Sequence, residues 1–224
     1  MKTAIIIHGC HLYATGWESI VWGNPQKRIL GRASRGILLA ISERPEFIWW
    51  GTGASEKGGV KEAQYTFDYA LEHLEELLPG YFETGHDRFA VRKFFQNRSL
   101  IDTTSQNTPE ETEHAMRLCK QKDVKRLFLV SSPTHIARCL QSAEIVRAQG
   151  GFEGLEIFAT SSDTCFSDST PKDVLIVEPP HRGDRPDVPI HKTLRRAMRL
   201  GRGKEAQEFN TALEKLLGEW EKGS

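Results

Sequence analysis

The sequence contains no long apolar run and little cysteine. No segment approaches the roughly 20 consecutive apolar residues of a membrane-spanning helix, and the short apolar run after Met1 lacks the length and cleavage site of a signal peptide. The four cysteines, Cys10, Cys119, Cys139 and Cys165, are scattered and form no CxxC pair. This spacing disfavours a disulfide framework and fits a cytoplasmic protein with free thiols.

The chain also lacks net charge and two familiar phosphate-binding motifs. Lys+Arg and Asp+Glu both total 30, so the charge balance does not indicate a nucleic-acid-binding protein. Neither GxxxxGK[ST] nor GxGxxG occurs. The 224 residues are enough for one sizeable core but not for two full domains. We therefore expect a single domain over residues 1–224, which binds a small molecule and neither nucleic acid nor membrane.

What the chain does contain is an alternation of apolar runs and helical patterns. We expect strands at residues 3–8, 46–50, 127–130, 155–159 and 174–177, with a short one at 99–101. Helical patterns cover residues 29–41, 60–78 and 107–122, and another begins at 133; residues 81–104 are ambiguous. This order predicts an α/β fold with a mostly parallel sheet and helices on both faces. We expect residues 178–224 to form a C-terminal helical extension packed on this domain.

The segment from Leu127 to Arg138 carries the strongest functional signal. A buried strand ends at Ser131, and Ser132 and Pro133 suit the N-cap and first position of the next helix. His135 and Arg138 then lie three apart on one helix face, next to a helix N-terminus that favours anions. Arg138 could clamp a carboxylate or phosphate, and His135 could act as acid or base. The alternative is a capping turn with a surface His and Arg.

Two other turns follow strands. After the first strand comes His8-Gly9-Cys10-His11, where either histidine is a candidate acid–base group, a ligand, or a strand-end side chain bonded to backbone. After the second comes the turn 51–55, whose glycines would let backbone N–H groups hold an anion; the alternative is a flexible connection. Glu62 follows in the first turn of the next helix.

A fourth turn, residues 105–111, leads into the helix expected at 107–122. Thr108 as N-cap, Pro109 at the first helical position and Glu111 two residues later make a capping box. That explanation accounts for Thr108 and Glu111 and leaves Asn107 and Glu110 free to face a site.

These turns should converge, because the carboxyl ends of parallel strands share one sheet edge. We expect His135 to act as general acid or base, with Glu62 or Glu110 orienting it or a metal. No metal ligand is assigned, since the histidine spacing matches no strong zinc pattern. The expected ligand-binding residues are Gly9, Cys10, His11, Arg32, Gly51, Thr52, Gly53, Asn107, Thr108, Ser131, Ser132 and Arg138.

Together these segments resemble the YdcF-like family, which includes the SanA and ElyC proteins. The positions that carry the resemblance, within residues 3–147, are Gly9, Arg32, Gly51-Thr52-Gly53, Glu62, Asn107-Thr108-Pro109-Glu110 and Ser132 to Arg138. The chain departs from the family pattern at Glu111, where Asn is usual, in the GTG turn, and at Cys10 and His11. The resemblance implies a Rossmann-like three-layer sandwich with a small-molecule pocket. It also implies links to S-adenosylmethionine, proposed as a ligand of one relative, and to envelope or polysaccharide biology.

Three functions are compatible with these residues. The first is an enzyme that transfers or hydrolyses a group of an anionic phosphorylated, nucleotide-like or carboxylated metabolite. The second is a non-catalytic module for S-adenosylmethionine or a nucleotide; this cofactor and a divalent metal are both possible. The third is an interaction protein in envelope or polysaccharide metabolism, with an exposed aromatic patch of Trp17, Trp22, Trp49 and Trp50. The alternative, which we favour, is that most of these tryptophans fill the core or line the pocket.

Overall fold

The computed structural model describes residues 1–79, 82, 85–163, 211 and 215. The chain divides into two units, residues 1–167 and 168–224, and the sheet and its helices belong to the first. Within the described residues no helix is long and apolar enough to cross a membrane.

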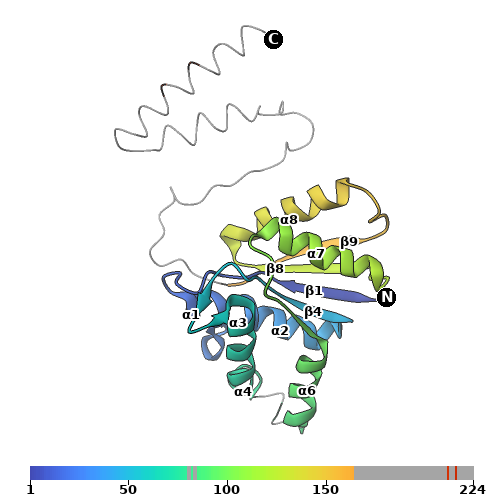
Figure 1. Cartoon of the computed structure of the whole chain (residues 1–224). Helices are drawn as coiled ribbons and strands as arrows, with labels where there is room; N and C mark the ends of the chain where they lie inside the picture. The colour runs from blue at the N-terminus through green and yellow to red at the C-terminus, as the bar shows by residue number, and fades with distance from the viewer. Residues whose placement is uncertain (80–81, 83–84, 164–210, 212–214, 216–224) are drawn as a thin grey trace, which may run out of the picture. The chain divides into compact units, whose positions relative to one another are not determined.

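The first unit is built on a five-stranded, all-parallel sheet (Figure 1). Its strand order is β7-β4-β1-β8-β9, which is the arrangement of a Rossmann-like fold. The strands are β1 (Thr3–Ile7), β4 (Phe47–Gly51), β7 (Ser99–Asp102), β8 (Arg126–Ser131) and β9 (Glu156–Ser161). The parallel sheet and the Rossmann-like fold class predicted from the sequence are thereby confirmed.

Helices cover both faces of this sheet. One face carries α1 (Trp17–Val21), α2 (Arg32–Glu43), α3 (Glu62–Glu72), α4 (Leu74–Leu77) and α6 (Arg88–Arg98), and the other carries α7 (Thr108–Gln121) and α8 (Pro133–Ala148), as Figure 1 shows. Two small hairpins, β2 (Gly23–Asn24) with β3 (Ile29–Leu30) and β5 (Glu56–Lys57) with β6 (Val60–Lys61), and the 3-10 helix Pro25–Lys27 complete the described elements.

The core lies in two layers because side chains alternate between the faces of a strand. In β1, Ile5 and Ile7 join the cluster under α2 and α3, whereas Ala4 and Ile6 join the cluster under α7 and α8. All residues of β1 are buried, as expected for a central strand of a parallel sheet. The sheet is therefore fixed from both sides, and so are the turns that leave its carboxyl edge.

The predicted strands within the described residues are all present, but two of the predicted helices need correction and the ambiguous region contains a helix. Residues 29–30 form a strand, so the helix expected at 29–41 begins at Arg32. The single helix expected at 60–78 is a short strand followed by α3 and α4, which meet at His73. The ambiguous region contains α6, whose N-cap Asp87 accepts a hydrogen bond from the backbone of Phe89.

The exposed aromatic patch is not present. Trp17, Trp22 and Trp50 are buried in the core, and Trp49 is half-buried. The strand expected at 174–177 and the helical extension expected at 178–224 lie outside the described residues.

Candidate functional site

The strand order defines a switch point between β1 and β8. From β1 the chain builds the sheet through β4 to β7 on one side, and β8 leads to β9 on the other. In open α/β sheets ligands bind beyond the carboxyl ends of the strands at such a point. His8 follows β1 here, and Ser131 and Ser132 stand where β8 passes into α8.

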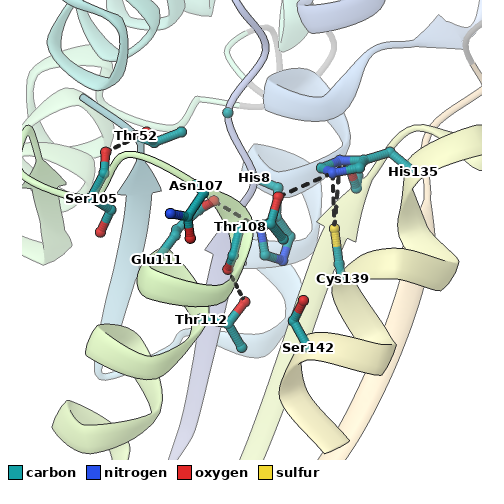
Figure 2. A network of polar contacts seen from close by, with 12 residues as sticks. His8, Thr52, Ser105, Asn107, Thr108, Glu111, Thr112, His135, Cys139 and Ser142 are labelled. Carbon is teal, nitrogen blue, oxygen red and sulfur yellow. Dashed lines mark hydrogen bonds and ion pairs between the residues drawn. The ribbon is translucent and has the colours of Figure 1, made fainter. Parts of the chain in front are cut away.

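At the switch point His8 forms a buried ion pair with Glu111 from the first turns of α7. Nδ1 of His8 lies 3.1 Å from Oε2 of Glu111, and their side chains are 0% and 1% exposed. Figure 2 shows the two side chains facing each other between β1 and α7. The contact has ion-pair distance without hydrogen-bond geometry, so both ring nitrogens of His8 and Oε1 of Glu111 have no hydrogen-bond partner. Buried polar atoms without partners are uncommon, and a catalytic role or a bound water or ion are common explanations for them.

The charge of this pair is set by opposing effects. Burial alone would lower the pKa of His8, but the Glu111 carboxylate and the nearby Cys139 outweigh it and raise the pKa to about 10. His8 is therefore a buried cation at neutral pH.

His135 lies beside this pair and joins the first turns of α7 and α8. Its Nδ1 is 2.8 Å from Oγ of Ser131, and its Nε2 is 3.2 Å from Oγ1 of Thr108. Arg138, which is exposed, donates from Nη2 to the same Nε2 at 2.7 Å. The predicted proximity of His135 and Arg138 is thus present as a direct hydrogen bond. Figure 2 shows the ring of His135 above Cys139, whose Sγ is 3.5 Å from Nδ1.

His135 is neutral at physiological pH. Burial, followed by the positive charges of Arg32, His8 and Arg138, lowers its pKa to about 3. An imidazole in this state is a hydrogen-bonding group over the whole physiological range and a weak base.

Arg32 does not face solvent as a free anion clamp. It is buried at the start of α2 and donates from Nε and Nη2 to Oγ of Ser132, at 3.1 and 2.6 Å. Its Nη1 donates to the carbonyl oxygens of His8 and Gly9. The guanidinium therefore ties the turn after β1 to the turn after β8, and it brings its positive charge to the floor of the site.

Glu62, the first residue of α3, is a second buried carboxylate. Oγ of Ser55 donates to its Oε2 at 2.5 Å and itself accepts from the backbone N–H of Leu12 at 3.0 Å. Burial is the main cause that raises the pKa of Glu62 to about 7, against the Ser55 hydrogen bond and with the help of the Glu111 charge. A carboxyl group with this pKa exchanges its proton readily near neutral pH.

The glycines of the site serve close packing. A methyl group at Gly9 would overlap the Glu62 carboxylate, one at Gly51 would overlap Glu111, and one at Gly53 would overlap the Thr103 carbonyl. The turn 51–55 is less open to an anion than its sequence suggests. The N–H of Gly53 already donates to the Ser105 carbonyl, and that of Ala54 to Oγ1 of Thr52.

The helix start at α7 differs from the predicted capping box. Asn107 is the N-cap: its Oδ1 accepts from the N–H of Glu110, and its Nδ2 donates to the Glu110 carboxylate at 2.6 Å. Glu110 also accepts from the N–H of Gln106. Glu110 thus performs the capping that was assigned to Glu111, while Glu111 is buried against His8.

The remaining predicted residues lie in the turn after β1. Cys10 is buried, and its carbonyl accepts from Nε1 of Trp17; burial raises the pKa of its thiol. His11 is exposed, and its Nδ1 accepts from the N–H of Tyr13.

Sequence reasoning placed the four segments correctly at one edge and missed the role of Glu111. A usable signal exists in the helix period, because Thr108, Glu111, Thr112, Ala115, Met116 and Cys119 are all buried and follow the spacing of one helix face. Glu111 belongs to this inward series, whereas Glu110 does not. No group of three or more His, Cys, Asp or Glu side chains that could hold a metal ion occurs among the described residues.

Comparisons with models of protein families, with curated proteins and with solved structures found no match. The resemblance to the YdcF-like family therefore stands on the residues quoted above.

Proposed function

We propose that the chain binds a small anionic metabolite at the switch point between β1 and β8 and transfers or hydrolyses a group of it. The candidate ligands are phosphorylated, nucleotide-like or carboxylated. The observation that carries this proposal is the layered arrangement at one edge. His135 and Arg138 lie at the helix start, above a buried His8–Glu111 pair with unpartnered polar atoms.

The electrostatics favour an anion. Arg138, Arg32 and the His8 cation supply three positive charges, and Glu111 supplies one full negative charge beside the partly protonated Glu62. Helices α2, α3, α7 and α8 all begin at this edge, and a helix N-terminus adds partial positive charge. The described site therefore favours a ligand with negative charge over a neutral one.

The acid–base role fits Glu62 better than His135. The pKa of Glu62, about 7, matches neutral operating conditions, whereas the pKa of His135 is about 3 and its Nε2 already accepts from Arg138. We assign proton transfer to Glu62, anion binding to Arg138 and the helix N-termini, and positioning to His135. Glu110 belongs to the helix cap in this assignment.

A second candidate is a non-catalytic module for a nucleotide or S-adenosylmethionine. The hydrogen bond from Arg138 favours it, because it occupies the ring nitrogen of His135 that would otherwise accept a proton. In that case the same residues hold the ligand and no proton moves. A cytoplasmic location and membership of the YdcF-like family belong to the proposal in either form.

A ligand screen on the full chain tests the proposal. Thermal unfolding is measured with inorganic phosphate, nucleotides, sugar phosphates and S-adenosylmethionine, and hits are confirmed by calorimetry and by product analysis. Binding of an anion that is lost at high salt, with product formation, supports the enzyme. Binding without product supports the module, and the absence of any hit in a panel that includes neutral analogues contradicts an anion site.

A further inference from the structure

The hydrogen bonds around His135 define its protonation state. A guanidinium has donors and no acceptor, so the 2.7 Å contact from Arg138 requires a lone pair on Nε2. The single proton of the neutral ring is then on Nδ1, where Oγ of Ser131 accepts it at 2.8 Å. If Nε2 were protonated, an N–H would face the guanidinium and the contact would become repulsive.

Charged groups from several elements act on this ring. These are Arg32 of α2, Arg138 of α8 and His8 at the end of β1. The uncharged contact is Cys139 of α8, whose Sγ lies 3.5 Å from Nδ1. The rings of His8 and His135 meet edge to face with centroids 6.1 Å apart. His8 in turn faces Glu111 of α7, its counter-ion at 3.1 Å.

We propose that His8, held as a cation by Glu111, is a positioning residue that keeps Nε2 of His135 unprotonated under acidic conditions and thereby holds the Arg138 guanidinium at the carboxyl edge of the sheet there. Two like charges at this separation disfavour each other, so a positive His8 disfavours a positive His135. His8 faces Glu111 on one side and the ring of His135 on the other. It acts through His135, and His135 acts through Arg138. The inference rests on the proposed function only for the last step, the anion that Arg138 meets.

The size of the effect follows from the ring separation. Two unit charges about 6 Å apart at an effective dielectric constant of about 20 shift each other's pKa by about two units. Removing the charge of His8 should therefore move the His135 midpoint upward by about two pH units, into a range where it can be measured. Burial, Arg32 and Arg138 remain in place and keep the midpoint below that of a free histidine.

The test is imidazole ¹⁵N NMR of the full chain without ligand, with His135 assigned through His135→Gln. In the wild type we expect a cationic His8 and a neutral His135 with its proton on Nδ1, both at pH 7. In His8→Gln the His135 midpoint should rise by about two pH units, and at a pH between the two midpoints the Arg138 guanidinium resonances should shift in the variant and not in the wild type, because the Nη2–Nε2 hydrogen bond is lost only in the variant. His73→Gln is the matched control: His73 pairs with Glu76 away from the switch point and should leave His135 unchanged.

Two further arms keep the test decisive. Glu111→Gln retains the His8 ring but removes its counter-ion, so His8 should lose its charge near neutral pH and the His135 midpoint should rise similarly. If neither variant folds, the wild-type spectrum decides. A neutral His8, or a His135 with its proton on Nε2, overturns the inference, and so does an unchanged His135 midpoint in a folded His8→Gln. Because the NMR experiment uses no ligand, it can support the role of His8 even if the ligand screen finds nothing. Equally, a ligand found in the screen would support the proposed function even if the NMR experiment contradicted the role of His8.

Discussion

His8 and Glu111 meet at 3.1 Å although they come from β1 and α7, and neither side chain reaches solvent. A buried ion pair of this kind contributes little net stability compared with apolar packing, but loss of one partner is costly because the other charge stays buried and unpaired. This makes Glu111 and its neighbour Glu110 a natural matched pair for mutation.

Glu111→Gln should lower the free energy of unfolding by about 3 kcal/mol, because it removes the counter-ion of the buried His8 ring, which then loses the stabilisation of its charged form and gives up its proton near neutral pH. Glu110→Gln should cost about 1 kcal/mol or less, since it weakens only a half-exposed helix cap. Urea denaturation of both variants at pH 7 measures the difference. Equal losses in the two variants would contradict the assignment of Glu111 to the core.

Alkaline pH provides an independent check on the same pair. The pKa of His8 is raised from 6.5 to about 10 in the folded state, mainly by Glu111 and Cys139 against the opposing effect of burial. The folded protein holds the His8 proton more tightly than the unfolded chain does, and this stabilises the fold. The stabilisation is complete below pH 6.5 and is lost as the pH rises towards 10. Below pH 6.5 Glu62 and His135 change the free energy of unfolding in opposite directions. The raised pKa of Glu62 makes the fold less stable as pH rises, whereas the lowered pKa of His135 makes it more stable.

The free energy of unfolding of the wild type should therefore fall between pH 6.5 and 10. The free energy of unfolding of His8→Gln should fall less steeply over the same range, because the variant lacks the contribution of the raised His8 pKa. Urea midpoints at a series of pH values give the two slopes. If the slopes coincide, His8 is not a buried cation.

The sequence predicts the outer part of the site better than its floor. The strand-to-helix turn at Ser131–Pro133 can be predicted from neighbouring residues alone, because an apolar run is followed by an N-cap residue and a proline. This pattern places His135 and Arg138 correctly. The strands are equally local signals, because buried parallel strands are continuous apolar runs. This is why the fold class follows from the sequence.

The floor of the site depends on contacts between distant segments. Asn107 and Thr108 are both good N-cap residues, and a shift by one residue decides which glutamate caps the helix and which enters the core. Capping preference alone does not make that choice; the inward spacing of the helix and the burial of Glu111 against His8 do. Arg32 is a similar case: its partners are the carbonyls after β1 and the hydroxyl of Ser132, so a residue expected to meet a ligand instead joins two turns.

The close approach of Gly51 to Glu111 gives a prediction about packing. In Gly51→Ala the new methyl group overlaps the Glu111 carboxylate, so we expect a loss of about 1–3 kcal/mol, the usual cost of overpacking. In a Glu111→Ala background the carboxylate is gone and the methyl group has space, so the same substitution should cost clearly less. A double-mutant cycle by urea denaturation measures the coupling. Strictly additive losses would place the two residues further apart.

The fourth prediction concerns the exposed end of the chain of contacts. Arg138→Ala should weaken binding of an anion identified in the ligand screen by about 10- to 100-fold, the scale of one charge-assisted hydrogen bond. Fold stability should change little, because Arg138 is exposed and an arginine in the first turns of a helix gains nothing from the helix dipole. Arg147→Ala is the matched control: it removes an exposed cation from the last turn of the same helix, where it pairs with Glu144. Calorimetry with the anion and with a neutral analogue separates charge from shape, since only the anion should lose affinity in Arg138→Ala. If both variants bind the anion as tightly as the wild type, the turn at α8 is a structural cap and the anion is held elsewhere.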